Sequence, residues 1–461
     1  MLKTTSMTQT MAKPHLFPRF TKRSINTALS SMLIAGSSFF ACTSAQAENL
    51  LEVYGMAFQS DPVLKQIIAQ RQSVGEGSVQ AFARFLPLVG LSADTQHIDT
   101  DYAGSPSFSY NKHGYSVNLN QSIFDNQNYV NYRISNLQIS KADAQLSAAQ
   151  QDLIIRTADA YFAVLSAVDT LEFAKAQRKA IGRQLEQAKR RYEVGIIAIT
   201  DVHEAQAGYD NAHAQVIAAE NSLQVAKETL RELTGQYIEH VSPLADKIPL
   251  DPPNPAKIQH WVDQALTGNY TLLAAKEDTE VQRENINLQR SGHYPTLGLT
   301  ASYGYNKNNN PVFNFAPQTH DKVIGVNLSI PIYEGNAVTS RTRQAQYDFQ
   351  RSQDYYNEIR NATEKNTRSS YLNVISEVSR VEALKQAVIS SESALKATEA
   401  GFEVGTRTIV DVLNVQRDLY RAKQDHSIAR YTYILNVLRL KQASGDLARA
   451  DLETVNGWLE K

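Results

Sequence analysis

The chain has 461 residues, 42% of them hydrophobic, and its formal net charge is −1. Because 46 basic residues are balanced by 47 acidic ones, the composition argues against a nucleic-acid partner. The length allows one or two ordinary domains.

Residues 1–47 have the pattern of a secretory signal peptide. A basic start is followed by an apolar run over 28–40 and then by small residues that include Ala45 and Ala47. This A-x-A pattern predicts cleavage before Glu48, so we expect the mature chain to begin there. The basic start is long and leaves three candidate initiating residues: Met1, Met7 and Met11.

Cys42 is the single cysteine and precedes the predicted cleavage site. In a lipoprotein signal it would carry a lipid anchor, but the bulky Phe39 and Phe40 fit such a cleavage motif poorly. We therefore favour a signal residue that is discarded, with lipidation as the alternative. The mature chain would then have no disulfide and no thiolate zinc site.

The first half of the mature chain alternates between helical and strand patterns. Residues 51–84 have a helical pattern, in which Asp61 and Pro62 suit a cap and a first turn. Alternation of apolar with small or polar residues then predicts a strand hairpin over about 88–124, with a polar loop at 100–114.

A long segment, 126–194, contains no proline. As one helix it would be about 100 Å long at ~1.5 Å per residue. Ile154, Ala158 and Tyr161 are spaced by four and then three residues, as in the seam of a coiled coil. We therefore expect this helix to pack lengthwise against other long helices.

The helix is expected to end at a tight turn, 195–200, because glycine favours the left-handed backbone that ends helices. Asp201 then suits the N-cap of a helix at 201–234. Residues 193–235 align without a gap with 403–445, where Asp411 takes the place of Asp201. A match of this length marks an internal repeat, so the two turns are expected to have related roles.

The predicted organisation follows from this repeat. It comprises a signal peptide (1–47), a first repeat (48–235), a proline-rich linker (236–260), a second repeat (261–445) and a C-terminal tail (446–461). The second repeat contains a helix, a strand hairpin at about 296–333, a long helix at 337–404, a turn at 405–410 and a helix at 411–444.

The predicted strands have one apolar face and one small or polar face, as in outer-membrane strands. Several aromatic residues near the loop ends suit a membrane interface: Tyr115, Tyr303, Tyr305, Phe313 and Phe315. A soluble sandwich with one wet face is the alternative. Four strands cannot close in lipid, so membrane strands would have to be shared between copies, and only about twelve would leave a channel.

These features resemble the TolC-type outer-membrane efflux proteins, and the TolC branch of that family in particular. The residues that carry the resemblance are the two turns, 191–202 and 404–413, and the strand exits, 121–125 and 330–335. The resemblance extends over nearly all of the mature chain.

The resemblance implies an α+β membrane protein that forms a homotrimer. Three chains would share a 12-strand β-barrel in outer-membrane lipid and a trimeric α-barrel of helical hairpins across the periplasm. A belt would be built from 236–260 and the tail. The implied function is a passive channel for drugs, bile salts, other small molecules or polypeptides. The implied partners are a periplasmic adaptor protein and an inner-membrane pump of the RND, ABC or MFS type, and no cofactor is expected.

The resemblance also implies a gate at the turns. Asp411 matches an acidic ring position, and Asn414 stands where a second aspartate is expected, so the attraction of cations should be weaker. Arg407 and Thr200 match a hydrogen-bonding pair. Capping alone is the alternative for Asp411, and Arg407 could be a plain surface charge.

One link of the implied gate is altered in this sequence. Asp201 matches the partner of a tyrosine hydroxyl, but the chain has Phe402 at the tyrosine position, and phenylalanine cannot donate that bond. A more easily opened gate is therefore predicted. The turn residues implied to contact the adaptor are Gly195, Ile196, Ile197, Ala198, Gly405, Thr406 and Thr408.

The sequence contains no nucleotide-binding loop, no nucleophile elbow and no zinc-protease motif, so we expect no enzyme and no metal site. His203-Glu204 lacks a second histidine at the required spacing. The alternative from another functional class is a soluble periplasmic coiled-coil scaffold or adaptor protein.

Overall fold

The computed structural model describes residues 47–101, 103–104, 106–309 and 318–460, within one compact unit, Gln46–Lys461. The expectations for Ala45, Cys42 and the initiating methionine lie outside the described residues. Ala47 and Glu48 are described: the Ser242 hydroxyl donates to the Ala47 carbonyl at 3.2 Å, and Glu48 forms a β-bridge with Val241.

The first repeat contains four helices and two strands. They are α1 (Leu50–Ser60), α2 (Pro62–Ala83), β1 (Leu88–Thr100), β2 (Phe108–Phe124), α3 (Asn126–Glu193) and α4 (Ile199–Thr234). The helix expected at 51–84 is divided in two, because Asp61 caps α2 by accepting the Leu64 N–H at 2.8 Å and Pro62 cannot donate to α1.

The second repeat follows the same order after the linker. It consists of α5 (Ile258–Gly268), α6 (Tyr270–Arg290), the short η1 (Ser291–His293), β3 (Thr296–Asn308), β4 (Gln318–Ser329), α7 (Ala337–Glu403) and α8 (Ile409–Ser444). Asn269 divides α5 from α6 and caps α6 through the Leu272 N–H at 3.1 Å. The tail carries one more helix, α9 (Arg449–Asn456).

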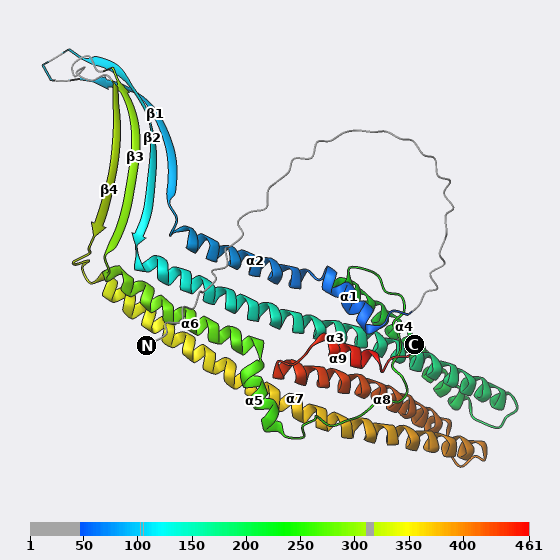
Figure 1. Ribbon diagram of the computed structural model, residues 1–461. Coiled ribbons are helices and arrows are strands. Elements are labelled where there is room, and N and C mark those ends of the chain that lie inside the picture. The colour runs from blue at the N-terminus through cyan, green and yellow to red at the C-terminus, as the bar shows by residue number, and fades with distance from the viewer. Residues whose placement is uncertain (1–46, 102, 105, 310–317, 461) are drawn as a thin grey trace, which may run out of the picture. The chain divides into compact units, whose positions relative to one another are not determined.

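The four strands form one antiparallel sheet in the order β1-β2-β3-β4, at one end of the long helices (Figure 1). The register gathers the apolar residues on one face. One row across the sheet consists of Val89, Leu119, Ala301 and Ile324, and a row on the opposite face consists of Ser92, Ser116, Gly304 and Asp321. The alternation predicted for the strands is therefore combined into one apolar and one polar sheet face.

The strands are longer than expected. The loop predicted at 100–114 is wrong over 108–114, because β2 pairs with β1 as far as Thr100 and Phe108. Polar side chains in this stretch bond across the strands, as His97 Nδ1 and Asn111 Oδ1 do at 2.7 Å, so apolar alternation is not needed there. Phe313 and Phe315 lie outside the described residues, whereas Tyr115 and Tyr305 stack at 5.2 Å between ring centroids.

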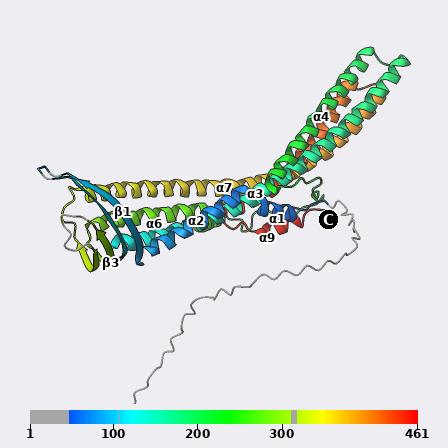
Figure 2. The same cartoon turned by 90° about the horizontal axis from the view of Figure 1, so that it is seen from above.

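The main core lies where the long helices meet the linker and the tail. Ile154, Ala158 and Tyr161 of α3 are buried there, as the coiled-coil spacing predicted. The Tyr161 hydroxyl donates to the Ser242 carbonyl at 2.8 Å and so joins α3 to the linker. Beyond this core, the part of the bundle that contains α4 runs at an angle to the helices near the sheet (Figure 2). Among the described helices none is both long and apolar enough to span a membrane.

Candidate functional site

The turns between α3 and α4 and between α7 and α8 lie at the end of the bundle remote from the sheet (Figure 1). Gly195 and Gly405 have φ angles of +77° and +78°, the left-handed conformation that glycine adopts without strain. Both turns close with the same backbone bond: Ile196 N–H to Arg191 O at 2.9 Å, and Thr406 N–H to Gly401 O at 2.8 Å. The two turns therefore share one geometry.

The expected capping roles of Asp201 and Asp411 are wrong in detail. The N-cap residues are Ala198, which makes no side-chain cap bond, and Thr408. Asp411 instead completes a capping box, accepting the Thr408 N–H at 2.9 Å while its own N–H donates to the Thr408 hydroxyl oxygen at 3.2 Å. Helix α8 starts at Ile409, earlier than the expected 411, because Ile409 is buried in its first turn.

The bonds from Thr408 affect the charge of Asp411. Its carboxylate accepts the Thr408 backbone N–H and hydroxyl, and Arg407 lies nearby, so the pKa of Asp411 is held below its ordinary value. The carboxylate is therefore ionised at neutral pH in a single chain. If copies of Asp411 formed a ring, their mutual repulsion would act in the opposite direction and raise the pKa.

A small apolar core joins the four helices behind the turns. This tip cluster consists of Leu185, Ala188, Ala205, Phe402, Ile409 and Val412. Phe402 is its largest buried member, with 9% of its surface exposed. The guanidinium carbon of Arg191 lies 4.8 Å from the centroid of the Phe402 ring, a cation–π contact between α3 and α7.

The structure places the remaining expected gate residues on the surface near the turns. Thr200, Arg407 and Asn414 are exposed. Within the described residues of a single chain, no hydrogen bond joins Arg407 to Thr200. Arg407 instead folds back over Gly401, where an added Cβ would lie 2.8 Å from the Arg407 Cγ. The implied pairing therefore has no counterpart within one chain.

The turns present apolar side chains to solvent. Val194, Ile196 and Val404 are 69%, 68% and 75% exposed. Ile197, which was expected to share this surface, packs against the tip cluster instead. Each turn therefore has a small exposed apolar surface beside its glycine.

An aromatic cluster that was not predicted from the sequence lies where the sheet meets the helices. Phe85 contacts Tyr129 and Tyr132, at 4.9 and 6.3 Å between centroids, and the ring of Phe82 lies 6.1 Å from Tyr132. Aromatic residues with a polar edge favour a membrane–water boundary. In the sequence, two of these aromatics stand at the end of one helical pattern and two at the start of the next long one, and this placement could have predicted the cluster.

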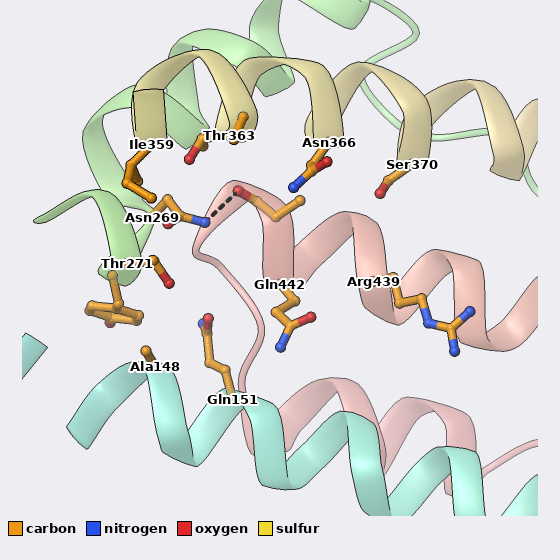
Figure 3. A pocket seen from close by; sticks show the side chains of 13 residues that line it. Ala148, Gln151, Asn269, Thr271, Ile359, Thr363, Asn366, Ser370, Arg439 and Gln442 are labelled. Atoms are coloured by element: carbon orange, nitrogen blue, oxygen red, sulfur yellow. Dashed lines mark hydrogen bonds between the residues drawn. The ribbon is translucent and has the colours of Figure 1, made fainter. Parts of the chain in front are cut away.

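A polar cavity of about 480 Å³ lies between α3, α6, α7 and α8 (Figure 3). Its amide side chains bind helix ends: Asn269 donates to the Ala443 carbonyl at 3.1 Å, and Gln151 donates to Gly445 and Leu447. These contacts indicate a structural joint. Among the described residues, no group of three or more His, Cys, Asp or Glu side chains is arranged to hold a metal.

Comparison with known proteins gives clear relatives. The family model described as outer membrane efflux protein matches residues 53–236 and 261–446. The chain is 41% identical over 417 residues to outer membrane protein TolC of Vibrio cholerae, covering 90% of this chain and 94% of that protein. It is 38% identical over 427 residues to TolC of Escherichia coli, covering 90% and 86% of the two chains.

Solved structures show the same fold at lower identity. The CmeC outer membrane channel of Campylobacter jejuni matches with a TM-score of 0.76 and 16% identity, covering 97% of this chain and 98% of that one. The predicted fold class and the predicted resemblance are both confirmed, as is the outer-membrane location. With both repeats matched by the family model and close relatives over nine-tenths of its length, the chain belongs to the outer membrane efflux protein family.

Proposed function

We propose that three copies of this chain form a passive conduit across the outer membrane and the periplasm. Their sheets combine into one barrel of about twelve strands, and their helical hairpins form an α-barrel below it. In this role the conduit is passive and catalyses no reaction, so partner proteins supply the energy for transport.

The open sheet carries this proposal. Among the described residues the strands pair in the order β1-β2-β3-β4, so the outer edges of β1 and β4 have no partner strand within one chain. One sheet face is apolar, with Leu91, Ile324 and Val326 at least 69% exposed. An apolar sheet face suits lipid, but open edges do not, so edges from different copies must pair.

We place the gate of the conduit at the paired turns. In a trimer, Asp411 contributes one carboxylate per chain to a ring that attracts cations, and Asn414 adds none. Arg407 and Thr200, which do not bond within one chain, are free to pair between neighbouring chains. The absence of a hydroxyl at Phe402 removes one bond to Asp201 from the closed state.

We assign the exposed turns to docking of a periplasmic adaptor protein. Val194, Ile196 and Val404 supply apolar contacts beside Gly195 and Gly405. The adaptor would connect the conduit to an inner-membrane pump of the RND, ABC or MFS type. Similar proteins are named for alkaline protease secretion and for cobalt-zinc-cadmium resistance, which supports both polypeptides and small solutes as cargo classes.

Cell fractionation and bilayer recording test the proposal. The mature chain should appear in the outer-membrane fraction as a trimer that survives SDS without heating. The purified trimer should conduct ions across a planar lipid bilayer. An easily washed monomer without conductance would instead support the soluble periplasmic scaffold.

A further inference from the structure

We propose that Arg191 is a positioning residue of the gate, which holds α3 to α7 by stacking its guanidinium on the ring of Phe402. This inference rests on the proposed conduit and concerns how the opening of its gate is controlled. The contact is diagonal, because α3 packs along its length against α4, α6, α2 and α8 and hardly at all against α7, the helix that carries Phe402. It therefore connects the two helical hairpins of one chain.

The geometry favours a specific contact over a chance approach. Phe402 is buried in the tip cluster among residues from all four helices, which restricts the positions that its ring can take. The backbone of Arg191 is fixed by the turn, since its carbonyl accepts the Ile196 N–H at 2.9 Å. Arg191 is half-buried, and a partly desolvated cation binds an aromatic face more strongly than an exposed one.

The seam between α3 and α8 next to the tip cluster has few other polar contacts among the described residues. Gln184 of α3 and Gln416 of α8 each bury a side-chain oxygen that lacks a hydrogen-bond partner among the described residues. The next bond along the seam is from Gln424 to the Thr170 hydroxyl at 3.1 Å. Buried polar groups without partners weaken an interface, so the tip cluster and its cation–π contact hold this end of the hairpins together.

This attachment affects the aperture through simple geometry. In a ring built from two hairpins per chain, the circumference at the turns depends on the spacing within each chain and on the spacing between chains. Arg191 and Phe402 fix the first of these spacings. Loss of either partner should let the hairpins separate and widen the conduit.

The test compares Arg191→Met with Arg190→Met. Arg190 lies in the same last helical turn of α3 and, among the described residues, forms an ion pair with Glu186 at 3.4 Å, so it controls for charge near the helix end. Arg191→Met and Phe402→Leu should each raise the open probability of the channel roughly fivefold, as expected for loss of a cation–π contact. Phe402→Tyr keeps an aromatic face and should stay as closed as the unsubstituted chain or more so.

The double variant Arg191→Met/Phe402→Leu gives the sharpest outcome. If the two side chains act through their mutual contact, it should be no more open than either single variant. Additive effects, or an Arg191→Met channel as closed as Arg190→Met, would overturn the proposal.

Amide hydrogen exchange separates failure of this contact from failure of the conduit. In the intact protein, the N–H groups of Ile196 and Thr406 should exchange faster in Arg191→Met than in Arg190→Met. If neither the unsubstituted chain nor any variant conducts ions, the proposed conduit is wrong. The amide exchange rates still show in that case whether the contact holds the two hairpins together. Equal exchange rates would refute the contact.

Discussion

Gly401 shows how a single residue shapes the turn. It lies in the last turn of α7, and an added Cβ would lie 2.8 Å from the Arg407 Cγ and 3.2 Å from the Thr406 hydroxyl oxygen. Because the Cγ atom is only one bond beyond Cβ, relief of this contact requires the whole Arg407 side chain to rotate away from the helix end. Glycine therefore allows the Arg407 side chain to fold against the helix end.

Gly401→Ala should accordingly fail to stabilise the protein. Alanine normally stabilises a helix interior by up to ~1 kcal/mol relative to glycine, but here the clash with Arg407 offsets that gain. Gly77→Ala in α2 is the matched control, because nothing lies within 4 Å of the added Cβ. Thermal melting in detergent should show a higher Tm for Gly77→Ala and an equal or lower Tm for Gly401→Ala; the reverse order would contradict the role of Gly401.

At the scale of elements, the junction between α1, α2 and α3 depends on one buried carboxylate. Asp61 is 1% exposed, caps α2, and accepts two bonds from the Arg156 guanidinium at 3.0 and 2.9 Å. The bond from Arg156 holds the pKa of Asp61 below its ordinary value. The ion pair thus orients α1 and α2 on the long helix.

Asp61→Asn should lower stability by about 2–3 kcal/mol, the usual worth of a buried charged hydrogen bond. Because the folded pKa is depressed, this contribution is present above the ordinary pKa of 3.8 and is lost as the pH falls through the lower folded value. The difference in Tm from the unsubstituted chain should thus be full at pH 7 and shrink below about pH 4. Asp152→Asn removes the exposed partner of Arg156 and should have little effect; an equal loss from both substitutions would refute the argument.

The long elements were predictable from sequence because their signals are local and repeated. Freedom from proline predicted α3 and α7, and the gapless repeat predicted that their turns would correspond. The capping role of Asp411 was mispredicted because burial of Ile409 and the Thr408 hydroxyl decide where α8 begins; α4 likewise begins before Asp201, at Ile199. The separate packing of Ile197 depends on contacts between distant segments, which a local pattern does not contain.

Arg191 illustrates the same limit at the candidate gate. Arg190 and Arg191 are adjacent and chemically identical, and both suit the negative end of α3. Only the rotation of α3 against α7 determines which of them meets Phe402. The gate residues expected from the family resemblance remain predictions, since their pairing between chains depends on the assembled trimer.

At the scale of the whole molecule, the assembly depends on the two open sheet edges. β1 begins and β4 ends at the helix-bearing end of the sheet, so β4 of one copy can pair with β1 of the next in the antiparallel sense used throughout. Closure in this way satisfies the backbone groups of both edges, which lipid cannot do.

Cysteine crosslinking tests this closure, because Cys42 is the only natural cysteine and precedes the predicted cleavage site. Ser92→Cys on β1 should be combined in turn with Val323→Cys, Gly325→Cys and Asn327→Cys on β4, since the register places all four positions on one sheet face. At least one pair should give covalent dimers and trimers after oxidation, because directly paired strands bring Cβ atoms within disulfide reach.

The matched control is a pair within one chain. Asn118 and Ser302 are direct partners in β2 and β3, so their double cysteine variant should oxidise but run as a monomer on a denaturing gel. If this control closes while every β1–β4 combination stays monomeric, the edges do not meet between copies. The shared barrel would then be wrong, because it requires β1 and β4 of neighbouring copies to pair. Without that pairing the backbone groups at both sheet edges would have no hydrogen-bond partners in lipid.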